Sequence, residues 1–275
     1  MKNILERNRV TVSGNSGPTL MYAHGFGCNQ AMWHRITGAF GQYRQVLFDY
    51  TGSGAVGAPF DATRYASLDG YVQDLLDVCD ALGLTEGVRF VGHSVSASIG
   101  LLASIARPGL FERMILIGPS PCFLNDPPDY VGGFEREDLA GLLDMMEQNY
   151  IGWAQYLAPV VAGAAQTEST GAELAASFCS TDPLAARTFA RATFFADNRA
   201  ELAAVTVPSL ILQHRRDALA PLTVGDYVHA QLANSRLQVL DVSGHCAHMS
   251  HPQLVVAAMR RYLSLAPADL LGQHQ

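Results

Sequence analysis

The sequence predicts an α/β protein with a mainly parallel central sheet that is flanked by helices. Short, continuous apolar runs at residues 19–23, 45–49 and 113–118 alternate with longer segments that have helical spacing. Strands of a parallel sheet have this character because helices cover both of its faces. Hydrophobic residues make up 49% of the 275 residues and charged residues only 16%, which indicates a large buried core.

The alternation is regular over the first 118 residues. We expect strands at residues 10–12, 19–23, 45–49, 88–91 and 113–118, and helices at residues 32–40, 68–82 and 97–105. The helix at 68–82 carries four aspartates, which we interpret as a solvated helix face rather than as catalytic groups: Asp69, Asp74, Asp77 and Asp80.

The alternation stops between residues 119 and 199. Helices are expected at 133–150, 153–161, 170–178 and 182–195, with no convincing strand among them. The sheet resumes at residues 209–213 and 237–241, with helices at 224–232 and 252–263, and the tail after Ala266 is expected to be disordered. We therefore expect a core formed by residues 1–118 and 200–275, and a helical cap (lid) formed by residues 119–199 over the ends of the strands.

Charge and composition exclude several classes of protein. The net charge is −7 and the sequence has no basic stripe, so nucleic-acid binding is not expected. No apolar run is long enough to span a membrane and the first ten residues lack the apolar segment of a signal peptide, which predicts a cytoplasmic protein. The five cysteines are scattered and form no C-x-x-C pair, so neither a zinc site nor a disulfide scaffold is expected.

Residues 88–99 carry the first catalytic signal. An apolar strand reaches Gly92, Ser94 stands at the bend, and a helical pattern follows. This arrangement is typical of the nucleophile elbow of α/β-hydrolases, in which the turn lifts a serine hydroxyl above the end of the sheet. The usual pattern is G-x-S-x-G, whereas this chain has Ser96 at the last position.

A serine nucleophile needs a base and an orienting acid, and in this fold they follow the serine in the order acid, then histidine. Asp217 follows the strand at 209–213, and His245 follows the last strand directly after a glycine. His248 and His251 are alternatives to His245, but His251 precedes Pro252 and is expected to help cap the final helix. The sequence therefore predicts a triad of Ser94, Asp217 and His245, with neighbouring His93 in a structural role.

An oxyanion hole requires two backbone N–H groups. One is expected from Val95, the residue after the nucleophile. The other is expected from Phe26 in the His24-Gly-Phe-Gly loop, which follows an early strand. No metal or organic cofactor is implied by this set of residues.

Further motifs lie outside the catalytic residues, including F-D-Y-T-G-S-G, P-S-P-C-F-L-N-D and G-H-C-A-H-M-S-H-P. With these motifs the chain resembles the RsbQ-like α/β-hydrolases, a bacterial stress-signalling group that also includes the plant karrikin and strigolactone receptors. The resemblance covers nearly the whole chain and implies that Ser96 is a feature of the group. The stretch H-R-R-D, which ends at Asp217, departs from the RsbQ-like pattern just before this acid.

The resemblance also implies a deep apolar pocket under a four-helix cap, lined by Phe26, Phe123, Trp153 and Phe194. For Trp153 and Phe194, a place in the core of the cap is the alternative. It further implies a small hydrophobic ligand and, as partner, a PAS-domain regulatory protein such as a phosphatase. Two functions stay open: hydrolysis of small, mostly apolar esters or lactones, or signalling by a module that binds or slowly cleaves a small molecule.

Overall fold

A seven-stranded sheet forms the centre of the molecule. The computed structural model describes residues 4–14, 16–54, 59–163 and 168–270. The strand order is β1-β3-β2-β4-β5-β6-β7, and only the pairing of β1 with β3 is antiparallel. This confirms the predicted, mainly parallel sheet. The strands are β1 Thr11–Ser13, β2 Thr19–Ala23, β3 Arg44–Leu47, β4 Val88–His93, β5 Phe111–Ile117, β6 Ser209–Arg216 and β7 Ser235–Ser243.

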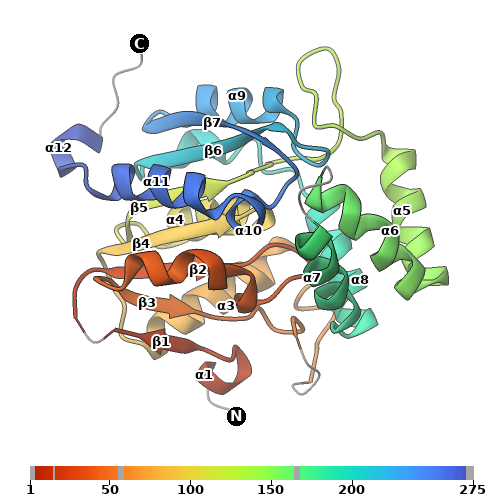
Figure 1. Ribbon diagram of the computed structural model, residues 1–275, viewed down its shortest axis with the longest axis horizontal. Coiled ribbons are helices and arrows are strands. Elements are labelled where there is room, and N and C mark those ends of the chain that lie inside the picture. The colour runs from red at the N-terminus through yellow and green to blue at the C-terminus, as the bar shows by residue number, and fades with distance from the viewer. Residues whose placement is uncertain (1–3, 15, 55–58, 164–167, 271–275) are drawn as a thin grey trace.

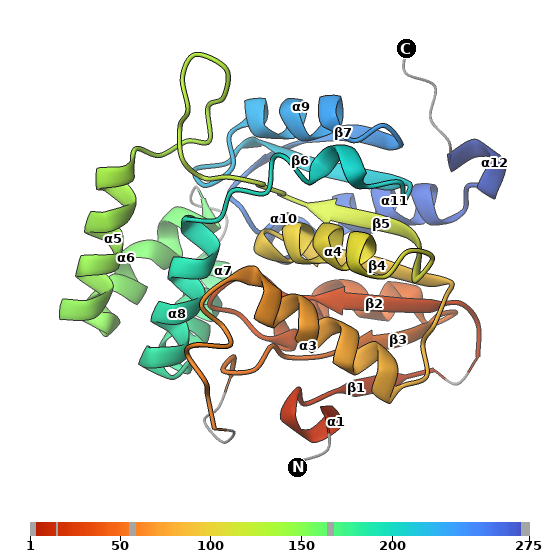
Figure 2. The ribbon, with the colours of Figure 1, turned by 180° about the vertical axis from the view of Figure 1, so that it is seen from behind.

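Helices cover both faces of the sheet. Helices α2 (His34–Thr37), α10 (Ala247–Ser250) and α11 (Pro252–Leu263) lie on the face toward the viewer in Figure 1. Helices α3 (Leu68–Ala81), α4 (Val95–Ala106) and α9 (Leu222–Gln231) lie on the other face, which Figure 2 shows. Each face holds its own apolar core, so the sheet is buried from both sides, as parallel sheets require.

Four helices lie between β5 and β6, in the segment expected to form a cap. They are α5 (Arg136–Gln148), α6 (Tyr150–Ala162), α7 (Glu168–Cys179) and α8 (Pro183–Phe194). All four gather beyond the C-terminal ends of the strands (Figures 1 and 2). The two chain segments that connect them to the sheet are joined, since Asn198 N–H donates to the carbonyl oxygen of Pro121 at 2.8 Å.

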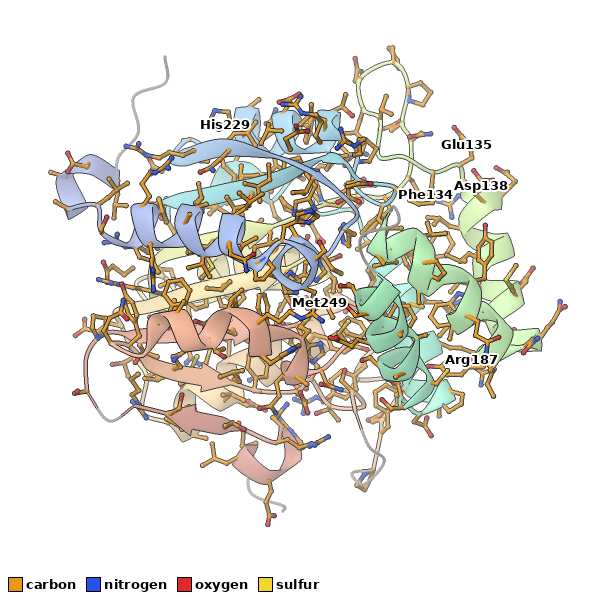
Figure 3. All side chains as sticks on the ribbon, viewed as in Figure 1. Phe134, Glu135, Asp138, Arg187, His229 and Met249 are labelled. Atoms are coloured by element: carbon orange, nitrogen blue, oxygen red, sulfur yellow. The ribbon has the colours of Figure 1, made fainter. Side chains whose placement is uncertain are left out.

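Polar side chains fix the first turn of this helical block. Figure 3 shows Glu135 and Asp138 close together where the chain enters α5. The Asp138 carboxylate accepts the backbone N–H of Glu135 at 3.2 Å, which satisfies one unpaired donor at the helix start. Asn149 then separates α5 from α6, because its side-chain oxygen accepts Gly152 N–H at 2.9 Å. One asparagine thus ends one helix and caps the next.

Two expected elements differ in the structure. Residues 32–40 do not form one helix but three short turns, η1 (Gln30–Trp33), α2 and η2 (Gly38–Phe40). Gly38 ends α2, as its low helix propensity favours. The tail after Ala266 is not uniformly irregular, since Pro267–Leu270 form the short helix α12, and residues 271–275 lie outside the described part of the chain. Two further short helices are α1 (Ile4–Arg7) and η3 (Leu202–Ala204).

Asp74 corrects the expectation of a solvated face on α3. Its side chain is fully buried, whereas Asp80 on the same helix is 58% exposed. The Asp74 carboxylate accepts the N–H of Thr51 at 2.8 Å and the hydroxyl of Tyr65 at 2.8 Å, and forms an ion pair with Arg7 at 3.1 Å. Asp74 therefore anchors the N-terminal segment and two loops to the core, a structural role that helical spacing alone does not indicate.

Replacing Asp74 with alanine is expected to lower the free energy of unfolding by about 3–5 kcal/mol, because the buried donors of Asn8, Thr51 and Tyr65 lose their charged acceptor. Asp80→Ala removes an exposed ion pair with Arg107 and is expected to cost less than about 1 kcal/mol. Urea unfolding of both variants, followed by circular dichroism, checks the difference. Equal costs would contradict the anchoring role of Asp74.

Candidate active site

The chain turns sharply at Ser94, between β4 and α4. Ser94 has φ 56° and ψ −122°, a backbone conformation that costs a non-glycine residue of order 1–3 kcal/mol. Its N–H donates to the carbonyl oxygen of Ile117 at 2.9 Å, which holds the turn against the end of β5. Such strain at a single serine between strand and helix is the expected geometry of a nucleophile elbow.

Ser96 links this turn to the loop after β2. A side-chain carbon at Gly92 would lie 2.6 Å from the carbonyl oxygen of Ser96, so glycine at position 92 allows the helix to pass close to the strand. The Ser96 hydroxyl donates to the carbonyl oxygen of His24 and lies 2.9 Å from the hydroxyl of Tyr50. Because the proton of Ser96 is used at His24, Tyr50 is the donor to Ser96. The serine of the G-x-S-x-S pattern therefore has a bonding role as well as a small size.

Ser94, His245 and Asp217 form one hydrogen-bonded chain. The hydroxyl of Ser94 lies 2.7 Å from Nε2 of His245, and Nδ1 of His245 lies 2.7 Å from Oδ2 of Asp217. The three residues follow β4, β7 and β6, so the ends of three parallel strands bring them together. His248 is buried without a hydrogen-bond partner among the described residues. His251 is the N-cap residue of α11, as expected, but its side chain bonds Ser250 and makes no cap hydrogen bond.

The carboxylate of Asp217 is held on both oxygens. Oδ1 accepts the backbone N–H groups of Leu219 at 2.9 Å and Ala220 at 3.1 Å, and Oδ2 faces the imidazoles of His245 and His214. Burial alone would raise the pKa of Asp217, but the two histidines outweigh it and hold this pKa well below its usual range. Asp217 is therefore an anion under all ordinary conditions and fixes the tautomer of His245.

Sequence reasoning did not find His214 as a neighbour of the acid. The departure H-R-R-D marked this stretch as unusual, but the pattern gave no reason to place His214 at the site. In the structure its Nδ1 lies 3.2 Å from Oδ2 of Asp217. Strand alternation gave no signal either, because residues 209–214 of β6 are all buried and Arg215 and Arg216 are both exposed.

The loop after β2 stands beside the nucleophile. A side-chain carbon at Gly25 would lie 2.5 Å from Nδ1 of His93 and 3.5 Å from the Ser94 side chain, so only glycine fits there. Gly27 has φ +70°, which also favours glycine. Val95 begins α4, and the first N–H groups of a helix have no acceptor within it. The assignment of Phe26 and Val95 as oxyanion donors stays a prediction that this arrangement supports.

His93 supports the loop of the catalytic histidine. Its Nε2 bonds the carbonyl oxygen of His245 at 2.9 Å, and the two rings lie 4.9 Å apart. Burial, together with His248 and His245, lowers the pKa of His93 well below its ordinary value. The ring is therefore neutral and can hold His245 in place without adding a charge beside it, which agrees with the structural role expected from the sequence.

A cavity opens directly onto the serine. It measures about 410 Å³ including its mouth. Its walls are largely apolar and come from both the core and the helices α6–α8. The lining residues are Phe26, Cys28, His93, Ser94, Phe123, Leu157, Val161, Leu174, Phe178, Thr193, Phe194, Leu219, His245 and Cys246.

Trp153 does not line this cavity, although the resemblance placed it there. Its indole is 1% exposed and packs 5.9 Å from the ring of Phe26 and 5.5 Å from that of Phe178. It thus stands behind two aromatic rings of the wall, in the core of the cap helices. Phe123 and Phe194 do line the cavity, with their ring centres 5.3 Å apart.

Two thiols in the wall do not compete with the serine. Burial raises the pKa of Cys28 to about 12 and that of Cys246 well above its usual value. Both thiols are therefore protonated, and a protonated thiol is a poor nucleophile. Cys246 Sγ lies 3.9 Å from Nε2 of His93, but this nitrogen donates to the carbonyl oxygen of His245 and cannot act as a base. Ser94, in contrast, faces Nε2 of His245.

Among the described residues, one group of side chains is close enough together to ligate a metal ion. The ligand atoms of His214, Asp217 and His245 lie within 4.8 Å of one another. In this arrangement they are occupied by hydrogen bonds to each other. Asp217 and His245 are thus the acid and the base of the triad, and His214 is a second hydrogen-bond partner of Asp217.

Three buried histidines predict how stability depends on pH. Burial lowers the pKa of His24, and more strongly those of His93 and His248. Unfolded imidazoles bind protons below about pH 6.5, so the unfolded state binds more protons there and the free energy of unfolding falls as the pH falls. We expect a slope of up to about 1.4 kcal/mol per pH unit for each imidazole.

Urea unfolding at several pH values between 5 and 7.5 measures this slope. His248→Gln removes one titrating group and is expected to make the slope shallower, whatever its effect on stability at pH 7.5. A free energy of unfolding that stays level down to pH 5 would show that these histidines are not buried as neutral rings.

Comparison with known proteins agrees with this geometry. The model of the alpha/beta hydrolase family matches residues 20–258. The chain belongs to this family. It is 40% identical to strigolactone esterase D14 of Arabidopsis thaliana over 95% of this chain and 98% of that protein. It is 35% identical to karrikin insensitive 2 receptor CA of Petunia hybrida over 94% of this chain and 96% of that receptor.

A solved structure gives the same result. A hydrolase from Oleispira antarctica superimposes with a TM-score of 0.93 at 42% identity, covering 96% of this chain and 97% of that one. The α/β-hydrolase fold and the resemblance to the group with the strigolactone and karrikin receptors are thus confirmed, and the protein is a hydrolase. No helix in the described part of the chain is both long and apolar enough to cross a membrane.

Proposed function

We propose that the protein is a serine hydrolase that cleaves small, mostly apolar esters or lactones through an acyl-enzyme. One observation carries this proposal: the chain from the Ser94 hydroxyl through His245 to Asp217, with both contacts at 2.7 Å. These are the distances expected between a nucleophile, its base and the orienting acid.

Each group has a defined task in the proposed reaction. Nε2 of His245 takes the hydroxyl proton as Ser94 attacks the carbonyl carbon, and the backbone N–H groups of Phe26 and Val95 stabilise the resulting oxyanion. His245 then gives its proton to the leaving alcohol, which leaves an acyl group on Ser94. The same histidine next activates water, which releases the acid, while anionic Asp217 stabilises the imidazolium in both halves.

The cavity favours a small, apolar substrate. Its wall presents the aromatic rings of Phe26, Phe123 and Phe194, and few polar groups besides the triad. Apolar lining with few polar groups suits an ester or lactone, whose polarity is concentrated at the carbonyl. The relative named strigolactone esterase supports this class of substrate.

A second candidate function is signalling by a ligand-binding module. It is favoured by the receptor name of the relative that is 35% identical over 94% of this chain. In that case the site binds or slowly cleaves a small molecule, and the protein then regulates a partner, for which the RsbQ-like resemblance suggests a PAS-domain phosphatase.

Turnover separates the two candidates. With p-nitrophenyl acetate and butyrate, the hydrolase proposal expects steady release of many equivalents of nitrophenol per protein molecule. One burst of about one equivalent followed by stalling favours the signalling module. Absence of both a burst and turnover, with these esters and with simple lactones, contradicts the hydrolase proposal.

We also propose a cytoplasmic location, as the sequence predicts. The support is that Cys28, Cys79, Cys122, Cys179 and Cys246 are all free thiols, which suits a reducing compartment.

A further inference from the structure

Two histidines face the same oxygen of Asp217, the acid of the triad. Oδ2 of Asp217 lies 2.7 Å from Nδ1 of His245 and 3.2 Å from Nδ1 of His214. The two imidazoles are inclined at 79°, so they approach this oxygen from different directions. A carboxylate oxygen can accept two hydrogen bonds, and here both are supplied by imidazoles.

The fold makes room for this pair of rings. His214 is in β6 opposite Leu240 of β7, and the register between the strands shifts just after it. Gly118 at the end of β5 completes the space: a side-chain carbon there would lie 3.2 Å from the His245 ring and 3.4 Å from the His214 ring. Its φ of +57° also favours glycine. A larger residue at position 118 would therefore crowd both rings.

The hydrogen bonds determine the tautomer of His214. An anionic oxygen only accepts, so Nδ1 of His214 carries the proton. Nε2 is buried and has no partner among the described residues, so a proton there would be a buried donor without an acceptor. His214 therefore donates to Asp217 through Nδ1 and has a bare Nε2.

From this arrangement we infer that His214 is a positioning residue that tunes the acid of the triad. Because it donates to Oδ2, it weakens the hydrogen bond that the same oxygen accepts from His245. The same contact stabilises the carboxylate in the orientation in which it faces His245. The inference rests on the proposed triad. It states that His214 weakens the Asp217–His245 hydrogen bond and thereby lowers the pH at which His245 acts as a base.

The other titratable groups around the pair do not replace His214. His93 faces His245 from the end of β4, and the ring of His248 on α10 packs against that of His93, with ring centres 4.6 Å apart and planes inclined at 56°. Both rings are neutral, because burial lowers each pKa well below its ordinary value. Arg215 and Arg216 point outward and pair with exposed Asp241.

Two variants of matched size test the donor. His214→Asn keeps an N–H near the position of Nδ1, whereas His214→Leu has a similar shape without a donor. Without the donor, Oδ2 binds His245 more strongly, so the acid limb of kcat/KM against pH is expected to move up by about 0.5–1 pH unit in His214→Leu. In His214→Asn it is expected to stay near the wild-type position. Equal shifts in both variants, or none in either, would overturn the inference.

A measurement on the unaltered protein covers the case in which His214→Leu does not fold. Histidine side-chain ¹H–¹⁵N spectra, assigned with His214→Asn, are expected to show a proton on Nδ1 of His214 and none on Nε2 at pH 7.5. A proton on Nε2 with a bare Nδ1 would refute the proposed hydrogen bond. Because this readout needs no turnover, it separates failure of this inference from failure of the proposed hydrolase function.

Discussion

Ser94→Ala is expected to reduce kcat for ester hydrolysis by roughly 10⁴- to 10⁶-fold, because no other group in the cavity can form the acyl-enzyme. KM is expected to change little, since the apolar wall that binds the substrate remains. Steady-state kinetics with p-nitrophenyl butyrate measure both values, and the loss is expected at every pH at which the protein is folded.

Ser98→Ala is the matched control. Ser98 is also a buried serine of α4, but its hydroxyl bonds the carbonyl oxygen of Ser120 at 3.0 Å, away from His245. This variant is expected to keep kcat within a few-fold of the unaltered protein. Substantial turnover by a folded Ser94→Ala protein would mean that another residue or a direct attack by water performs the chemistry.

Asp217→Asn is expected to lower kcat at neutral pH by about 10⁴-fold through the tautomer of His245. The N–H groups of Leu219 and Ala220 bond Oδ1, so they hold the amide oxygen of asparagine at that position. The amide nitrogen then faces His245 and donates to Nδ1. The imidazole proton is forced onto Nε2, which can no longer accept the proton of Ser94.

Asp241→Asn serves as its control, since this exposed aspartate on β7 pairs with Arg215 and Arg216. Its kcat is expected to equal that of the unaltered protein. Histidine NMR of Asp217→Asn is expected to show the proton of His245 on Nε2. A variant that keeps full activity would show that Asp217 does not orient the base.

Much of the site could be predicted because it depends on the order of elements along the chain. In a parallel sheet the C-terminal ends of the strands lie at one edge, so residues just after β4, β6 and β7 must come near one another. This places Ser94, Asp217 and His245 together without any knowledge of distances. The sheet could be predicted for a similar reason, because apolar runs and helical segments alternate along the chain.

What the sequence did not predict depends on packing between distant segments. His214 and Asp74 look like ordinary polar residues until β5, the N-terminal segment and the loops close around them. Trp153 was placed by resemblance in the wall of the pocket, yet the rings of Phe26 and Phe178 stand in front of it. The side chain of His251 bonds its neighbour Ser250 and does not cap α11, which the order of residues along the chain does not reveal.

The central claim is that Ser94 is an activated nucleophile within the Ser94–His245–Asp217 chain. Labelling with a fluorophosphonate, followed by intact-mass and peptide mass spectrometry, tests it most directly. We predict one adduct per molecule, located on Ser94, with much slower labelling of His245→Ala at pH 7.5. An adduct on any other residue, or no adduct on a protein that hydrolyses esters, would contradict the claim.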